Sequence, residues 1–398
     1  MTAAAAGCGG GDRRPSDGQA IVLDSAAEVG MNSVAESYVQ LVLAVGQHDP
    51  NYVDAYYGPK QWQDDAEENR LPLGTIRSMA LEQLDTLDQD GRPARDELLK
   101  LRYDYLTKQL QSLIAHTRMI EGDRLSFDEE SKALYDAVAP THTERAFQGV
   151  LDELAQELPG TGSLHDRYAA FREDFVIPTG RVDDVFRAAI AACRERTVQW
   201  VDLPEAESFV VEYVKDKPWS GYNWYQGNFQ SLIQVNIDFP IYIDRALDLA
   251  CHEGYPGHHV YNVLLEANLT QERRWMEFSV YALFSPQSLI AEGSANYGID
   301  MTFSRKERLA FEKAHLFPLA GLEPSLAERY YKVEELVEHL DFANNEAARA
   351  YVDGVMSKVE TIAYLKKYSL LTQQRAEQPP RAPQAGDVRD QRAGRRRN

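Results

Sequence analysis

Three of the nine histidines lie within eight residues, beside a glutamate, in the stretch 252–259 (His-Glu-Gly-Tyr-Pro-Gly-His-His). Zinc peptidases use a His-Glu pair on a helix, followed by a second histidine about one turn later. The two imidazoles bind one metal ion and the carboxylate activates a water molecule. The pattern therefore predicts that His252 binds zinc and that Glu253 is the general base.

The second imidazole ligand depends on how the chain passes Pro256 and Gly257. On an undistorted helix His259 would lie near the face of His252, and His258 would point about 120° away from it. Proline cannot donate a backbone hydrogen bond to the carbonyl of His252 and crowds that carbonyl, while glycine lets the backbone turn. We therefore expect a bulged or broken helix here and His258 as the ligand, with His259 as the alternative.

A third ligand is expected from a second apolar helix, over residues 288–297, in which Glu292 is the single acidic residue. A lone carboxylate in such a helix is costly unless it is paired or binds a metal. Asn296 lies four residues further on, hence on the same face, where its amide could hydrogen-bond a ligand imidazole. Three protein ligands would leave a fourth position for water, as in catalytic zinc sites.

A hydrolase of this kind also needs a donor for the oxyanion that forms in the reaction. Tyrosine hydroxyls can serve, and the candidates are Tyr222, Tyr225, Tyr297 and Tyr351. Because the chain has 21 tyrosines, a core or surface role is favoured for each one taken singly.

The motif His-Glu-x-x-Pro-Gly-His-His at 252–259, followed by Glu-Gly-x-Ala at 292–295, resembles the bacterial domain-of-unknown-function 885 proteins, over about residues 200–370. That family is similar to the helical gluzincins, among them carboxypeptidase Taq. The resemblance implies a mainly α (α+β), gluzincin-like fold with a small β-sheet next to the metal-binding helix. It also implies that the strand around Gln234 to Asn236 offers backbone groups to an extended substrate.

Composition limits the class of protein. With 398 residues and 44% hydrophobic side chains, the chain can form one large or two ordinary domains. A net charge of -20, without a basic patch along most of the length, argues against nucleic acid as a partner. No apolar run approaches the roughly 20 residues that a transmembrane helix needs. The oligomeric state is left open.

The chain divides into four expected segments. Residues 1–30 are rich in Gly, Ala and Asp and are expected to be a disordered tether, with order beginning near a capping box at Ser33 and Glu36. Residues 31–200 are expected to be a helical region. Residues 201–372 form the zinc-binding catalytic region, in which 209–214 and 222–236 read as strands. Residues 373–398 are expected to be a disordered basic tail.

The first residues also bear on location. Cys8 follows small residues and precedes glycines, as in the tail of a bacterial lipoprotein signal, although the basic and apolar parts of such a signal do not precede it. As written the chain would be cytoplasmic; with a longer start it would be a cell-envelope lipoprotein anchored at Cys8.

These observations favour a zinc metallopeptidase that cleaves short peptides with a metal-activated water. One alternative is a metal-dependent hydrolase of a non-peptide amide or ester, which the same ligands would serve. The other is a zinc-binding protein without turnover. Glu253 argues against that alternative, because a closed structural site needs four ligands and no general base.

Overall fold

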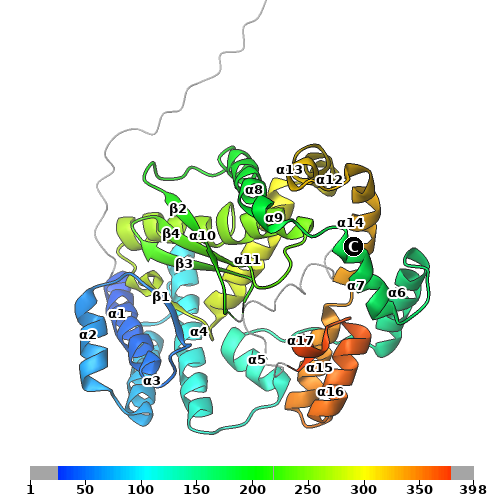
Figure 1. Ribbon diagram of the computed structural model, residues 1–398. Coiled ribbons are helices and arrows are strands. Elements are labelled where there is room, and N and C mark those ends of the chain that lie inside the picture. Colours follow the sequence, from blue (N-terminus) through cyan, green and yellow to red (C-terminus); the bar gives the residue numbers. More distant parts are fainter. Residues whose placement is uncertain (1–25, 218, 378–398) are drawn as a thin grey trace, which may run out of the picture.

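The computed structural model describes residues 26–217 and 219–377. It is mainly helical with two small β-sheets (Figure 1), so the mainly α (α+β) class predicted from the sequence is confirmed. Within the described residues no helix is long and apolar enough to cross a membrane. Cys8 lies outside the described residues.

Four helices build the N-terminal part, coloured blue to cyan in Figure 1: α1 (Ala26–Gly46), α2 (Lys60–Asn69), α3 (Leu73–Asp90) and α4 (Glu97–Ile120). Their apolar faces meet in one core, to which α1 contributes Val34, Tyr38 and Val42. α4 begins at Asp96, whose carboxylate accepts hydrogen bonds from two backbone N–H groups of the first turn.

The predicted start of the first helix was wrong. Ser33 lies inside α1, which begins at Ala26, and is not an N-cap. The residues before Ser33 include two alanines, which favour helix, and Met31, which is buried in the core. Packing of Met31 therefore extends the helix beyond the local capping signal.

Four further helices lead to the sheet: α5 (Phe127–Tyr135), α6 (Glu144–Glu157), α7 (Leu164–Glu173) and α8 (Val182–Thr197). α5 begins at a capping box formed by Ser126 and Glu129, as the sequence predicts. α8 presents Val185, Ala189 and Cys193 to a second core. It shares this core with residues 249–251, which precede His252.

The three-stranded sheet consists of β2 (Ser208–Val214), β3 (Gly221–Gly227) and β4 (Gln230–Asn236), in the order β2-β4-β3. β2 runs parallel to β4, and β3 runs antiparallel to it. Three helices follow: α9 (Ile243–Leu249), α10 (His258–Leu265) and α11 (Pro286–Thr302). α10 packs against β3 and β4, so the expected sheet beside the metal-binding helix is present.

A second sheet, of two short strands, was not predicted. β1 (Val53–Tyr56) pairs antiparallel with β5 (Val280–Ala282), and the register of the pairing shifts between Val53 and Ala55. This pairing attaches the N-terminal helices to the segment that leads into α11.

The chain ends in a group of helices, yellow-brown to red in Figure 1: α12 (Arg305–Phe311), α13 (Phe317–Ala320), α14 (Ala327–Glu338), α15 (Phe342–Val352), α16 (Lys358–Tyr368) and α17 (Gln373–Ala376). Several of them pack with α6 and α7 around a third core that includes Phe147, Val333 and Tyr368. The segment predicted as a tail begins with the short helix α17, and residues 378–398 lie outside the described residues.

Candidate metal centre

The segment that carries the histidines is a helix interrupted at the predicted place. A π-helical turn over Ala250–Gly254 follows α9, residues 255–257 are not helical, and α10 begins at His258. The Tyr255–Pro256 peptide bond is cis. The backbone N–H of Gly257 donates to the carbonyl of Cys251 at 2.9 Å, which closes the interruption. The prediction of a broken helix at Pro256 and Gly257 is confirmed.

Gly257 has a steric reason to be glycine. A Cβ at this position would lie 1.8 Å from the carbonyl oxygen of His252 and 2.4 Å from that of Cys251. Real Cβ atoms do not approach backbone oxygens so closely, so any side chain would push the two halves of the interrupted helix apart. Because Gly257 has no side chain, the backbone can turn closely enough here for His258, six residues after His252, to lie beside it.

As a result, His252 and His258 lie side by side, with their Nε2 atoms 3.2 Å apart. Glu292 completes the group from α11, with Oε1 3.3 Å from His258 Nε2 and Oε2 3.5 Å from His252 Nε2. One ligand atom from each of the three residues lies within 4.8 Å of the other two. Two imidazole nitrogens and a carboxylate oxygen are a donor set that zinc accepts.

The side chain of Glu292 fits a role as a metal ligand. Its Oε2 atom is buried and forms no hydrogen bond within the described residues. A buried carboxylate oxygen without a hydrogen bond costs stability, even with Nε2 of His252 3.5 Å away, and a cation bound between the three side chains would satisfy it. The donor chemistry and the missing hydrogen bond both agree with a metal ion at this position.

Small residues on α11 let it approach the histidine segment. A Cβ on Gly298 would lie 3.1 Å from the carbonyl oxygen of Cys251 and 3.3 Å from Cδ of Pro256. Asn296, the predicted outer residue, is buried on α11, and its Nδ2 has no hydrogen-bond partner within the described part of the chain. The hydrogen bond from the Asn296 amide to a ligand imidazole therefore stays a prediction.

Glu253 lies next to the group. Its Oε1 is 4.0 Å from Nε2 of His252, and its backbone carbonyl accepts a 2.7 Å hydrogen bond from the amide of Asn223 on β3. Gly221, also on β3, leaves room for the carboxylate, since a Cβ there would lie 3.0 Å from Oε1. Burial raises the pKa of Glu253 to about 7, helped by the charge of Glu292 and opposed by His258.

The pKa of His258 is also raised, but here the shift favours the charged form of the side chain. Burial by itself lowers the pKa of His258, but the carboxylates of Glu292, Glu253 and Asp54 outweigh this effect and raise it to about 9. The site is therefore a place where positive charge is strongly stabilised, which is what a cation-binding site requires.

Sequence reasoning missed one carboxylate of this neighbourhood, Asp54 on β1. Burial raises the pKa of Asp54 to about 7, and the charged groups that act on it are His258, Glu292 and Glu253. The signal that could have indicated Asp54 is an acidic residue inside the short aromatic and β-branched run 52–57.

His259, the alternative ligand, is not brought into the group. Its Nδ1 lies 2.9 Å from Oγ of Ser231 on β4, and its Nε2 lies 3.0 Å from Oε2 of Glu207. Both ring nitrogens thus have partners in a fully buried position. The structure favours His258 over His259 as the second ligand.

The four candidate oxyanion donors are spread over different elements. Tyr222 packs against Trp219 and Trp224, and Tyr225 donates its hydroxyl to Glu266. Tyr297 is 54% exposed and five residues beyond Glu292, so it points about 140° away from that side chain on the helix. Tyr351 lies on α15. The hydroxyl of Tyr225 is thus held by Glu266 and Tyr297 faces away from Glu292, while the proposed roles of Tyr222 and Tyr351 stay predictions.

The expectation that the strand around Gln234 to Asn236 binds an extended substrate was wrong. These residues belong to β4, which is the central strand and is hydrogen-bonded to β2 on one side and to β3 on the other. A central strand has no unpaired edge to which a peptide could add.

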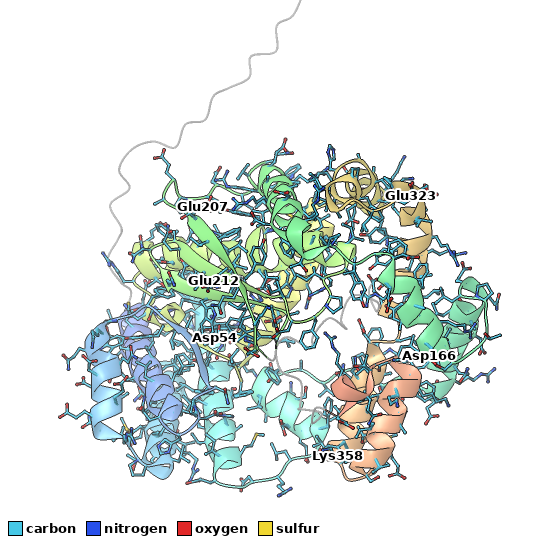
Figure 2. All side chains as sticks on the ribbon, in the orientation of Figure 1. Asp54, Asp166, Glu207, Glu212, Glu323 and Lys358 are labelled. Atoms are coloured by element: carbon cyan, nitrogen blue, oxygen red, sulfur yellow. The ribbon has the colours of Figure 1, made fainter. Side chains whose placement is uncertain are left out.

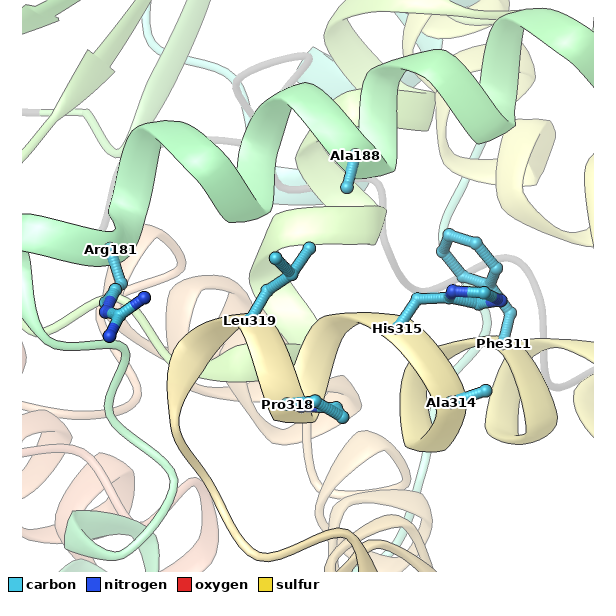
Figure 3. A pocket seen from close by; sticks show the side chains of 7 residues that line it. All are labelled: Arg181, Ala188, Phe311, Ala314, His315, Pro318 and Leu319. Atoms are coloured by element: carbon cyan, nitrogen blue, oxygen red, sulfur yellow. The ribbon is translucent and has the colours of Figure 1, made fainter.

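A separate groove of about 460 Å³ lies between α8 and the segment Phe311–Leu319 (Figure 3). Arg181 and His315 lie at its ends, and apolar side chains such as Leu319 lie between them. None of its lining residues belongs to the His252, His258 and Glu292 group.

Comparisons with known proteins do not show the function of this chain. No protein-family model and no curated protein matches the chain. Among solved structures, the chain is similar to a proposed lipoprotein from Colwellia psychrerythraea (TM-score 0.44, 14% identity), over 81% of this chain and 63% of that one. It is also similar to an M32 carboxypeptidase from Deinococcus radiodurans R1 (TM-score 0.33, 13% identity), over 91% of this chain and 78% of that one.

The chain thus spans less than two thirds of the Colwellia protein. Likeness at these scores carries no argument about function, and the resemblance to the domain-of-unknown-function 885 family stays a prediction. What the structure itself contributes is a group of two histidines and a glutamate that could hold a metal ion.

Proposed function

We propose that this protein is a zinc-dependent hydrolase that cleaves peptide bonds, most simply in short peptides. The observation that carries the proposal is the convergence of His252, His258 and Glu292, with one ligand atom of each within 4.8 Å of the others and the buried carboxylate of Glu253 beside them. Two histidines and a glutamate with a second carboxylate beside them are the ligand set and the general base that a catalytic zinc site requires.

In this proposal His252, His258 and Glu292 hold the zinc ion. When bound, zinc supplies a Lewis acid that polarises the scissile carbonyl and lowers the pKa of water. Three protein ligands leave coordination free for the reactants, which distinguishes a catalytic zinc site from a closed structural one.

Glu253 is the residue that moves the proton. Its carboxylate takes a proton from the attacking water and delivers it to the leaving nitrogen. Burial raises the pKa of Glu253 above the ordinary value of a glutamate, which makes its carboxylate a stronger base. Asn223 fixes the backbone of Glu253 through its carbonyl, which limits where the carboxylate can lie.

The two alternatives differ from this proposal in testable ways. A hydrolase of non-peptide amides or esters would use the same residues, so only substrates separate the two. A zinc-binding protein without turnover would need a fourth protein ligand. His259, the residue nearest in sequence that could serve, is held instead by Ser231 and Glu207.

The test is Glu253→Gln in zinc-loaded protein, assayed on a peptide library and on a panel of esters and non-peptide amides. We expect the variant to keep one zinc per chain and to lose about a hundredfold or more in turnover on peptides. Glu272→Gln makes the same chemical change at an exposed position. It is the control and should behave as wild type.

Full activity in Glu253→Gln would contradict the proposed role of this carboxylate. Wild-type turnover of esters or amides without any peptide cleavage would replace the peptidase with the first alternative. Zinc binding without turnover of any member of the panel would leave the second.

A further inference from the structure

Asp54 has features that its role as a residue of a short strand does not explain. Its Oδ1 atom is buried and forms no hydrogen bond within the described residues. It lies where the register of β1 against β5 shifts, between Val53, which pairs with Ala282, and Ala55, which pairs with Tyr281. A buried carboxylate oxygen without a hydrogen bond calls for a partner that residues 26–217 and 219–377 do not supply.

A chain of contacts places Asp54 on the Glu292 side of the proposed metal site. Ala55 pairs with Tyr281 on β5, and the hydroxyl of Tyr281 donates to Oγ of Ser288 at 3.2 Å. Ser288 precedes Glu292 by four residues, so both lie on one face of α11. Figure 2, in which Asp54 is labelled, shows the residue where β1 meets the centre of the molecule.

Asp54 is near the proposed metal ligands without being one of them. The group whose ligand atoms all lie within 4.8 Å of one another contains His252, His258 and Glu292 but not Asp54. Its carboxylate nevertheless interacts electrostatically with His258, Glu292 and Glu253.

The charges around Asp54 indicate which kind of substrate group would pair with its carboxylate. A divalent ion would be balanced by the carboxylates of Glu253 and Glu292, with both histidines neutral. When ionised, Asp54 then adds one negative charge, and two of the three charged groups that act most strongly on it, Glu292 and Glu253, are themselves carboxylates. A cationic group of the substrate would balance it, whereas a carboxylate of the substrate would be repelled.

We propose that Asp54 binds the ammonium group of the substrate, so that the site takes substrates with a free amino group next to the bond that is cut. This inference rests on the proposed function, which it extends from peptides in general to peptides cleaved at their amino end. An ammonium group has three donors, and a charge-assisted hydrogen bond to Oδ1 would satisfy the unpaired oxygen.

The first experiment measures binding and needs no turnover. Zinc-loaded protein is titrated calorimetrically with leucine hydroxamate and with N-acetyl-leucine hydroxamate, which differ in the amino group that carries the charge. Wild type should bind the free amine about 10- to 100-fold more tightly, the range for a hydrogen bond between charged groups. Equal affinity for the two probes overturns the role of Asp54.

The second experiment uses Asp54→Asn, which keeps the size of the side chain and removes its charge. The preference for the free amine, in hydroxamate affinity and in kcat/KM for leucyl dipeptides against their N-acetyl forms, should fall at least tenfold. Hydrolysis of the N-acetyl peptides and the zinc content should change little. Asp65→Asn, an exposed residue of α2, is the matched control and should keep the wild-type preference.

The outcomes separate the two proposals. Peptide cleavage with no dependence on the amino group, or with a preference that Asp54→Asn leaves intact, overturns this inference and leaves the peptidase. Failure to cleave any peptide rejects the proposed function, while the hydroxamate titration still decides whether Asp54 binds an ammonium group. If Asp54→Asn does not fold, the same comparison is made with Asp54→Ser, and equal affinity of the wild type for the two hydroxamates still overturns the inference.

Discussion

The neighbouring residues His258 and His259 have different surroundings because one step along a helix rotates a side chain by about 100°. His258 points to Glu292, with 3.3 Å between Nε2 and Oε1. His259 points to the sheet, where Ser231 and Glu207 are within hydrogen-bond distance of its two ring nitrogens. His259 therefore holds α10 against β4 and against the residues just before β2.

Glu207 is the centre of that second contact. Its carboxylate accepts hydrogen bonds from Tyr255 at 2.7 Å and from Arg194 at 2.6 Å, in addition to its contact with His259. Burial by itself would raise the pKa of Glu207, but the hydrogen bonds from His259, Arg194 and Tyr255 outweigh it and lower the pKa to about 2. Glu207 is therefore expected to be ionised down to strongly acidic pH in the folded protein.

This shift predicts a pH dependence of stability. The folded pKa lies below the unfolded value of about 4.3, so Glu207 stabilises the folded protein above that unfolded value, and the contribution is lost as the pH falls toward 2. Allowing for solvent screening at the half-exposed Arg194, we expect the contribution to be on the order of 2 kcal/mol. Urea unfolding of wild type and Glu207→Gln at pH 7, 4 and 3 measures it.

The difference in unfolding free energy between the two proteins should shrink as the pH is lowered through this window. Glu205→Gln, two residues away and exposed, provides the control and should follow wild type at each pH. A difference that stays constant with pH would show that Glu207 acts through its shape and not through its charge.

At the scale of the element, the proposed site depends on the interruption between α9 and α10 in the helix that carries His252 and His258. The π-helical turn Ala250–Gly254 and the non-helical residues 255–257 replace the regular turn that would have carried His258 away from His252. π-Helical turns occur frequently at functional sites because they change which residues share a face. Gly257 makes this local path possible because it has no Cβ, which would overlap with two backbone carbonyl oxygens.

Gly257→Ala should therefore remove metal binding. The added Cβ would meet the carbonyl oxygen of His252 at 1.8 Å, and a backbone atom cannot move aside as the end of a flexible side chain can. We expect loss of zinc, measured by metal analysis, and a lower unfolding temperature. The cost should be well above the roughly 1 kcal/mol of an ordinary helical substitution.

Gly293→Ala is the matched control, next to Glu292 on α11. Nothing lies within 4 Å of the position where its Cβ would be, so the variant should keep zinc and gain up to about 1 kcal/mol from helix propensity. Zinc retained equally in both variants would show that the passage at Gly257 does not set the geometry of the site.

At the scale of the whole molecule, local patterns predicted what depends on local sequence. Helical spacing, the Ser126 capping box and the break at Pro256 each have a cause within a few residues, and the structure confirms them. β1 and β5 were missed because strands of four and three residues show no period, and they pair across more than 200 residues. The proximity of Asp54 to Glu292 follows from that pairing, so the local run 52–57 could mark Asp54 as an acidic residue in a strand but could not place it near Glu292.

The same logic explains the wrong assignment of a substrate-binding edge to β4. Alternating side chains show that a segment is a strand but not which strands flank it. The crossover that places β2 beside β4, parallel to it, is a property of the assembled sheet. The position of a strand within a sheet depends on long-range pairing, which the sequence of the strand does not contain.

The proposed metal would connect elements that are distant in the chain. His252 and His258 lie on either side of the helix interruption, and Glu292 lies on α11. An ion bound by all three stabilises the folded state by mass action, by about 4 kcal/mol when its concentration is a thousandfold above the dissociation constant. Removing zinc with a chelator should therefore lower the unfolding temperature by several degrees, and adding zinc should restore it, as scanning calorimetry can measure.

Glu292→Ala shows whether this shift belongs to the proposed site. Without the carboxylate that lies 3.3 Å from His258 and 3.5 Å from His252, the variant should lose zinc, and its unfolding temperature should no longer respond to the chelator. His315→Ala changes an imidazole that lines the separate groove, and it should keep the full zinc-dependent shift. A zinc-dependent shift that survives in Glu292→Ala would mean that the third ligand lies elsewhere, whereas its loss in both variants would mean that zinc acts through more than one site.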